Sequence, residues 1–477
     1  MASEEKGIYR AELARRQLAI KEAGLPVVVV LEGYGAAGKG SALGSIIKYM
    51  DPRFFKAYNM DVITDEEMRR PFLYRHFIKL PAKGNFAFFD GGLLDEVTDD
   101  YLIGAIDENE YNRRIESVKN YERQLVDNGY LLVKFFFKID KKTQKKRLDA
   151  LLDKKSTSYR VSDKDLWQNK HFDKCEAVYD EYIKATDSKL CPWHVISADD
   201  RDEVERFVAN TIVSSIDAAI KDPYLAEIQD NKYNLLPFDG LSSVELSGKE
   251  MTDEEYKAEL KKCQKELKKL HNKLYQAKIP VIIAYEGWDA AGKGGNIKRV
   301  TASLDPRGFE VFPIASPSAE EKNRHFLWRF YNRLPKTGHI AVFDRTWYGR
   351  VMVERLEGFC SENDYKRAYN EINEFEKDLT DWGAVVIKFW VQIDKDTQLE
   401  RFTDRKNTPE KQWKITDEDW RNREKWDSYE GAIDEMITKT NTDFAPWYVL
   451  ESNDKKYARV KALKLVIERI KEALKDN

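Results

Sequence analysis

Cysteine and histidine are scarce in this sequence, and neither is grouped in a way that would build a site. The 477 residues include four cysteines and six histidines. No two cysteines form a C-x-x-C pair, so the sequence indicates neither a zinc site nor a disulfide framework. Because unpaired cysteines are typical of reducing compartments, we expect a cytoplasmic protein.

Long apolar runs are absent as well. Runs such as Val27–Leu31 have the length of one β-strand and are far too short to cross a membrane. The first ten residues are charged and lack the apolar segment of a signal peptide. We therefore expect neither a secretion signal nor a membrane partner.

Neither sign of charge is in excess. Lys and Arg number 80 and Asp and Glu number 83, which gives a net charge of −3. Proteins that coat nucleic acid are usually strongly basic, so we expect no nucleic-acid partner. A polyanion would have to bind at a local basic patch. With 42% apolar residues, the chain can still bury the cores of two or three domains.

The most informative feature that is present is an internal repeat. The pattern G-x-x-x-x-G-K occurs at Gly33–Lys39 and again at Gly287–Lys293, so the two lysines are 254 residues apart. Five further short motifs, which begin at positions 51, 89, 134, 139 and 192, recur at the same offset. A constant offset over most of each half indicates the duplication of a whole domain.

Each half alternates strand-like and helix-like segments. In the second half, short β-branched or aromatic runs predict strands at Pro280–Tyr285, His339–Phe343, Ala384–Ile393 and Trp447–Glu451, with polar helices such as Glu362–Asp381 between them. This alternation is typical of an α/β domain with a parallel sheet. We predict two tandem domains at residues 1–221 and 251–477, joined by a linker at 222–250 where Pro, Gly, Ser and Asn accumulate. A long amphipathic helix is expected at Thr252–Ala277.

The second G-x-x-x-x-G-K motif has the features of a working P-loop. Such a loop binds phosphate through backbone N–H groups at a helix N-terminus, and its lysine neutralises the terminal phosphates. Gly294 follows Lys293 here, where P-loops usually carry the Ser or Thr that binds magnesium. We therefore expect Asp289, inside the loop, and Asp344, at the end of an apolar strand, to hold Mg²⁺.

Basic residues surround this motif. They follow the loop and the Asp344 strand at Lys298, Arg299, Arg345, Arg350 and Arg355. A guanidinium can donate two parallel hydrogen bonds to a phosphate, and such charges stabilise a phosphoryl group during transfer. A single basic residue on a helix is more often merely solvated, so we interpret these five as a group.

The first half keeps Lys39 and Asp90 but loses the rest of the set. The residues at the positions of Asp289, Lys298, Arg299, Arg345, Arg350 and Arg355 are Gly35, Gly44, Ser45, Gly91, Glu96 and Tyr101. An anionic substrate would meet a carboxylate where the second half has an arginine. We expect the first half to be a structural partner without catalytic activity.

These motifs resemble those of the polyphosphate kinase 2 family. The resemblance rests on Gly287–Gly295, the Lys298-Arg299 pair and Phe343–Glu357, and Thr416–Tyr429 resembles the family's lid. It covers nearly all of residues 280–450, and the tandem arrangement is similar to the two-domain branch of the family.

The resemblance implies a P-loop kinase fold similar to thymidylate kinase, with a helical lid. It also implies the Mg²⁺-dependent, reversible transfer of a phosphoryl group between inorganic polyphosphate and a nucleotide. For the two-domain branch the implied acceptor is AMP, which gives ADP.

The implied roles of individual residues are as follows. Asp289 and Asp344 would hold the metal and orient the attacking phosphate, while Lys293 and Arg345 would contact the transferring group. The loop glycines and further cations would bind substrate, with two of the cations in the lid: Gly287, Gly292, Gly294, Gly295, Lys298, Arg299, Arg350, Arg355, Arg405 and Lys414.

Three alternatives remain open from the sequence. The enzyme could use polyphosphate to make ATP or GTP from nucleoside diphosphates, or it could be an ATP-dependent nucleotide kinase. A polyphosphate-binding pseudokinase scaffold is the alternative without catalysis. The fused copy could also form an internal pseudo-dimer, and a homo-oligomer is left open.

Overall fold

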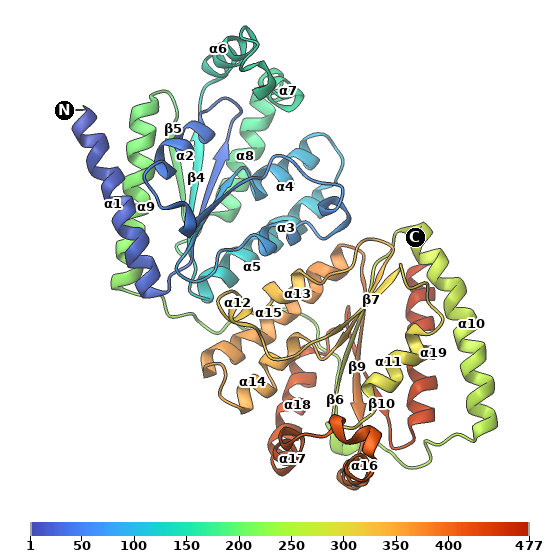
Figure 1. Ribbon diagram of the computed structural model, residues 1–477. Coiled ribbons are helices and arrows are strands. Elements are labelled where there is room, and N and C mark those ends of the chain that lie inside the picture. The colour runs from blue at the N-terminus through green and yellow to red at the C-terminus, as the bar shows by residue number, and fades with distance from the viewer. Residues whose placement is uncertain (1, 476–477) are drawn as a thin grey trace. The chain divides into compact units, whose positions relative to one another are not determined.

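The computed structural model describes residues 2–475, without the side chains of residues 2–10 and 414. The chain forms two compact units, labelled along the sequence in Figure 1. The first unit runs to Glu67 and includes Phe72–Glu227 and Ser318–Trp328. The second contains Met68–Pro71, Ile228–Pro317 and the chain from Arg329 on. The main division thus falls at Glu227, within the segment predicted as a linker.

Each unit is built on a five-stranded parallel sheet, which confirms the predicted α/β class. The first sheet has the order β2-β3-β1-β4-β5 and the second the order β7-β8-β6-β9-β10, so the two topologies are identical. The strands are β1 (Val27–Gly33), β2 (Phe55–Asn59), β3 (Phe86–Asp90), β4 (Leu131–Lys138), β5 (Trp193–Ser197), β6 (Val281–Gly287), β7 (Phe309–Pro313), β8 (Ile340–Asp344), β9 (Val385–Gln392) and β10 (Trp447–Glu451).

Helices connect the strands in both halves. The first half contains α1 (Ala2–Ala23), α2 (Lys39–Ile47), α3 (Tyr74–Ile78), α4 (Leu93–Leu102), α5 (Glu108–Asp127), α6 (Lys141–Leu152), α7 (Asp163–Lys170), α8 (Phe172–Thr186) and α9 (Arg201–Lys221). The second half contains α10 (Asp253–Ala277), α11 (Lys293–Thr301), α12 (Ala319–Lys322), α13 (Trp328–Tyr331), α14 (Val353–Leu356), α15 (Glu362–Asp381), α16 (Lys395–Asn407), α17 (Asp417–Glu424), α18 (Trp426–Thr440) and α19 (Lys455–Ala473). Short 3₁₀ turns include η5 (Trp347–Arg350) and η6 (Pro409–Lys414).

Strand β9, which lies between β6 and β10, shows why these segments form a buried parallel sheet. All eight of its residues are buried, as expected for a strand covered by helices on both faces. Its one cation, Lys388, donates to Glu376 of α15 at 2.7 Å, and the same pair recurs in the first unit as Lys134 and Glu122 at 2.7 Å. A buried cation is tolerated only with such a partner, so this pair belongs to the fold of both units.

Helices cover both faces of the second sheet. In Figure 1, α10 and α19 lie side by side on one face, and α15 and α18 lie on the other. The predicted helix at Thr252–Ala277 is α10, which Thr252 caps by accepting a hydrogen bond from the Glu255 backbone. Among the described helices, none combines the length and the apolar character that crossing a bilayer requires.

The sequence patterns did not predict the edge strand β7. Its residues Phe309–Pro313 are half-buried or exposed, so the segment lacks the continuous apolar run that marks the central strands.

Candidate active site

The second P-loop joins β6 to α11 and depends on two glycines. Gly287 has φ +150°, and a Cβ there would lie 2.6 Å from the Val391 carbonyl oxygen, so no other residue fits without displacing β9. Gly292 has φ +113° and begins α11 as its N-cap. The Nζ of Lys293 donates to the carbonyl oxygens of Gly287 at 2.5 Å and Trp288 at 3.1 Å. The ammonium group of Lys293 therefore lies against the loop, at the place where this motif binds phosphate.

Asp289 lies at the centre of a hydrogen-bonded cluster above the loop. Its Oδ1 accepts from Nη2 of Arg345 at 3.2 Å, and its Oδ2 accepts from Nδ2 of Asn422 at 3.1 Å. Burial opposes ionisation of Asp289, but the charges of Lys293 and Arg345 outweigh it and lower the pKa of the carboxyl below its usual value. Asp289 is therefore an anion held between two cations.

Arg345 occupies a backbone conformation that its side chain does not favour. Its φ is +64°, in the left-handed region, and the equivalent residue of the first unit is Gly91 with φ +83°. A residue with a Cβ costs about 1–2 kcal/mol in this conformation. Such strain is typical of functional sites, and here the conformation places the guanidinium against Asp289.

Asp344 is brought to the same edge of the sheet by strand register. It ends β8 and is paired with Tyr285 of β6, two residues before the P-loop begins. Burial lowers the pKa of Lys293, while the charges of Asp289 and Asp344 act in the opposite direction. The structure thus brings together four of the predicted residues, Asp289, Lys293, Asp344 and Arg345.

Two further residues of the cluster escaped the sequence patterns. Glu286, at the end of β6, is buried and accepts hydrogen bonds from N and Oγ1 of Thr346, each at 2.7 Å. Burial raises the pKa of Glu286. Asn422 comes from α17 in the segment identified as the lid. Glu286 stands directly before the loop and could have been noticed, whereas nothing in its local sequence distinguishes Asn422.

The predicted basic residues separate into two groups. Arg350 forms an ion pair with Glu354 at 3.1 Å, and Arg355 forms one with Glu435 at 2.5 Å, so both charges are already compensated. Lys298 and Arg299 lie in the last turn of α11, and the Nη1 of Arg299 donates to the Gly295 carbonyl oxygen at 3.1 Å.

The remaining predicted residues lie around the loop or in the lid. Gly294 and Gly295 belong to the first turn of α11, and a Cβ on Gly294 would meet open space. Arg405 is in the last turn of α16. Lys414 ends η6, and its side chain lies outside the described part of the structure.

The first unit has the same loop with an inverted electrostatic environment. The Nζ of Lys39 donates to the Gly33 carbonyl oxygen at 2.8 Å, as in the other loop. Burial opposes its charge, but Asp95, Asp61 and Asp90 raise the pKa of Lys39 above its usual value. Carboxylates therefore surround the lysine in the region where the other unit places arginine.

Helix α7 also fills the place of the missing loop carboxylate. A Cβ on Gly35 would lie 2.0 Å from Oδ1 of Asp165, so an aspartate cannot be accommodated there without moving the helix. Lys164 holds the helix in this position through ion pairs with Asp99 at 2.6 Å and Asp95 at 3.3 Å. This geometry disfavours a phosphate ligand in the first loop.

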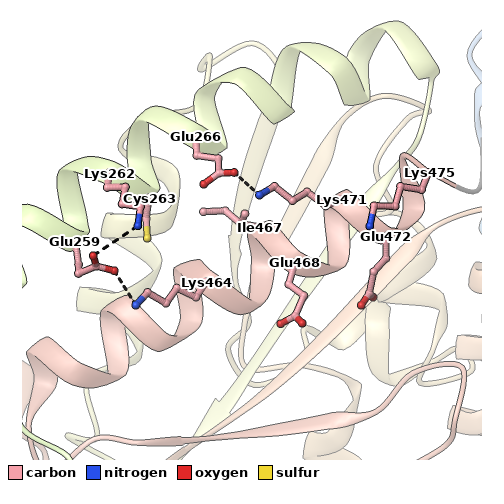
Figure 2. A pocket seen from close by; sticks show the side chains of 10 residues that line it. All are labelled: Glu259, Lys262, Cys263, Glu266, Lys464, Ile467, Glu468, Lys471, Glu472 and Lys475. Atoms are coloured by element: carbon pink, nitrogen blue, oxygen red, sulfur yellow. Dashed lines mark ion pairs between the residues drawn. The ribbon is translucent and has the colours of Figure 1, made fainter.

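A hollow in the second unit lies between α10 and α19 (Figure 2). It has a volume of about 370 Å³, and four lysines and four glutamates line it together with Cys263 and Ile467. The pairs drawn in Figure 2 include Lys464 with Glu259 at 2.7 Å and Lys471 with Glu266. Because its charges cancel, this groove does not fit a polyanion.

Comparison with known proteins agrees with this geometry. The polyphosphate kinase 2 (PPK2) family model matches residues 2–223 and 250–477. The chain belongs to the polyphosphate kinase 2 family. The polyphosphate:AMP phosphotransferase of Pseudomonas syringae pv. tomato is 39% identical to it over 94% of this chain and 90% of the relative. The enzyme of that name from Pseudomonas aeruginosa is 38% identical over 98% of this chain and 95% of the relative.

A solved structure of the family has the same fold. A crystal structure from Pseudomonas aeruginosa, described as polyphosphate kinase 2, superposes with a TM-score of 0.86 and 35% sequence identity. The match covers 100% of this chain and 96% of that one. Both PPK2 units of the chain thus have a counterpart in a structure of the family.

Proposed function

We propose that this chain transfers a phosphoryl group from inorganic polyphosphate to AMP, with ADP as the product. The observation that carries the proposal is the cluster of Lys293, Asp289 and Arg345 above the P-loop of the second unit. The relatives that match almost the whole chain are named for this activity. The reaction is reversible, because a phosphoanhydride bond is broken and another is formed.

The transfer needs no strong general base. An oxygen of the AMP phosphate, already ionised at neutral pH, attacks the terminal phosphorus of the polyphosphate. The bridging P–O bond then breaks, and the shortened chain leaves with the electron pair. Lys293 and Arg345 offset the negative charge on the transferring group, which is the main contribution that a protein makes to phosphoryl transfer.

The carboxylates fit a magnesium ion. Asp289 and Asp344 offer the oxygen ligands that Mg²⁺ prefers, next to the loop that holds phosphate. Among the described residues, no three acidic, histidine or cysteine side chains are grouped to bind a metal by themselves. A bound Mg²⁺ would supply further positive charge to the phosphates at the loop.

We assign catalysis to the second unit and a structural role to the first. Carboxylates face the P-loop lysine of the first unit, and α7 occupies the space of the missing aspartate. We also retain the cytoplasm as the proposed location, consistent with four cysteines that form no disulfide.

A donor–acceptor matrix tests the proposal. Purified protein with Mg²⁺ receives polyphosphate or ATP as donor and AMP, ADP, GMP or dTMP as acceptor, and the nucleotides are separated by chromatography. We expect ADP from AMP with polyphosphate alone, and no turnover after chelation of the metal. ATP formed from ADP instead would overturn the assignment of the acceptor, and turnover only with ATP would overturn that of the donor.

The duplication supplies a matched control. Lys293→Ala should abolish transfer. Lys39→Ala, the same change in the other P-loop, should lower stability but leave the kcat of the folded protein within about twofold. Equal losses of kcat in two variants that are both folded would contradict the assignment of catalysis to the second unit.

A further inference from the structure

The turn that carries Arg345 is tied to the end of β6 by hydrogen bonds. The backbone N–H of Arg345 donates to the Tyr285 carbonyl oxygen at 3.1 Å. The next residue, Thr346, donates from its N and its Oγ1 to Oε1 of Glu286, each at 2.7 Å. The same Oγ1 accepts from the backbone N–H of Tyr348 at 3.2 Å. Two successive residues of β6 thus hold two successive residues of the turn.

The bonds between Glu286 and Thr346, which we call the clamp, lie in the interior. Glu286 is 5% exposed and Thr346 is 3% exposed. A buried donor or acceptor is costly to leave without its partner, so these bonds should persist in solution. The side chain of Arg345 is by contrast 51% exposed, and its left-handed backbone is one that a residue with a Cβ disfavours. The position of its guanidinium therefore depends on the bonds that hold the turn.

The first unit shows what the threonine adds. There Glu32 stands at the position of Glu286, and its Oε1 accepts directly from the backbone N–H of Leu94 at 3.1 Å. Leu94 is the counterpart of Tyr348. In the second unit the hydroxyl of Thr346 is inserted between the same two groups. The hydroxyl is therefore an addition to a contact that the fold already provides.

The threonine of the clamp occurs together with the arginine. Gly91 and Gly92 stand at the positions of Arg345 and Thr346 in the first unit. A Cβ on Gly92 would lie 2.8 Å from Oε1 of Glu32, so a threonine does not fit that turn as it stands. Because the same fold forms in the first unit without either side chain, the pair points to the activity and not to the fold.

We propose that Glu286 and Thr346 are positioning residues that hold the guanidinium of Arg345 in place for phosphoryl transfer. This rests on the proposed function, in which that guanidinium contacts the transferring group. The clamp acts through the backbone of Arg345, so its loss leaves the charge in the site but lets its position vary. A donor helps most when it is preorganised toward the developing charge, and displacement by about 1 Å can cost about 10²-fold in rate. The clamp should thus affect kcat and not the binding of either substrate.

The clamp is tested first with variants of Thr346. Thr346→Val has the same shape without the hydroxyl and should lower kcat about tenfold, while KM for AMP and for polyphosphate stays within about twofold. Thr346→Ser keeps the hydroxyl, and its kcat should lie within about threefold of the wild type. Should the valine prevent folding, Thr346→Ala removes the same hydroxyl without a methyl group in its place and carries the same expectation.

The matched control is Thr186→Val in the first unit. Thr186 is also buried, and its Oγ1 donates to the Tyr182 carbonyl oxygen at 2.8 Å and accepts from Nε1 of Trp193 at 2.9 Å. The change therefore removes a hydroxyl that donates one bond and accepts one, as at Thr346. It should lower the midpoint of denaturant unfolding by a similar amount and leave kcat unchanged, which separates positioning from stability.

A double-mutant cycle shows whether Thr346 acts through Arg345. In the Arg345→Gly background, Thr346→Val should change kcat by less than about twofold, because no guanidinium is left to position. A contact of Thr346 with substrate, or a general loosening of the site, would lower kcat about tenfold in both backgrounds. Glu286→Gln keeps an oxygen that accepts from Thr346 and removes only the charge, so its kcat should stay within about threefold of the wild type.

Four results would overturn the clamp. They are a wild-type kcat for Thr346→Val, an equal loss in both backgrounds of the cycle, an equal loss in the Thr186→Val control, and a loss in Glu286→Gln as large as that in Thr346→Val. The last would indicate that the charge of Glu286 acts on Lys293, whose pKa it tends to raise. The proposed function fails separately, when the wild-type protein gives no polyphosphate-dependent ADP in the donor–acceptor matrix. An active wild type with Thr346 variants that match it would refute the clamp alone.

Discussion

Replacement of Arg345 by glycine should separate activity from stability. The change copies Gly91 of the first unit into the equivalent position of the second. It removes the guanidinium that contacts Asp289 at 3.2 Å and releases the backbone strain at φ +64°. Loss of the contact with Asp289 should lower stability, whereas relief of the backbone strain should raise it. The two effects on stability therefore have opposite signs.

The expected change in stability is small. Relief of the left-handed conformation should stabilise the fold by about 1–2 kcal/mol. Glycine gives the unfolded chain more freedom, which costs about 0.5–1 kcal/mol. The side chain of Arg345 is 51% exposed, so solvent screens its ion pair and the loss is worth about 0–1 kcal/mol. The net change in the free energy of unfolding should therefore lie between a loss of about 1 kcal/mol and a gain of about 1.5 kcal/mol.

The expected change in rate is large. Removal of one preorganised donor from a developing anionic charge typically lowers kcat by about 10²–10³. Initial rates of ADP formation at saturating polyphosphate and AMP give kcat, and denaturant unfolding followed by tryptophan fluorescence gives stability. Arg345→Lys keeps the positive charge but loses the planar set of N–H donors of the guanidinium. Its kcat should lie between those of the wild type and Arg345→Gly.

The converse change provides the control. In the first unit, Gly91→Ala forces a Cβ to within 2.5 Å of Oδ1 of Asp61 at φ +83°. It should destabilise the protein by about 1–2 kcal/mol or more and leave kcat unchanged. A kcat within threefold of wild type for Arg345→Gly would refute contact with the transferring group. A loss of more than about 3 kcal/mol in that variant would refute the argument from strain.

A further prediction concerns the segment that resembles the lid. Asn422→Ala removes the donor to Oδ2 of Asp289. It should lower kcat about tenfold with unchanged thermal stability, because Asn422 orients a carboxylate that is proposed to hold the metal. A rate equal to wild type would show that the contact is incidental.

Features fixed by short-range patterns could be predicted from the sequence. The P-loop follows from its own spacing, and α15 begins and ends at the predicted residues Glu362 and Asp381. Asp344 could be placed because it ends an apolar strand, and parallel strands bring their carboxyl ends to one edge. The same reasoning could not place Asn422 or the partner of Arg355, because these contacts join segments whose spacing in sequence carries no period. The partner of Arg350 is Glu354, four residues further on, so this ion pair could have been predicted.

The duplication supplies the information that periodicity lacks. With catalysis assigned to the second unit, as proposed, a residue shared by both units is assigned to the fold, and one found only in the second unit is a candidate for function. The pair of Lys388 with Glu376 has an equivalent in the first unit, and each pair satisfies buried groups of its own unit. Arg345 and Thr346 have none, because their counterparts are glycines. Lys39 looks like an exception, because it persists in a unit that lacks the counterparts of Asp289 and Arg345. Its surroundings explain it: the charges of Asp95, Asp61 and Asp90 raise the pKa of Lys39, so a neutral side chain would remove a counter-charge from this group of carboxylates. These contacts give Lys39 a structural role that does not depend on phosphate, so the P-loop motif alone does not identify the catalytic copy.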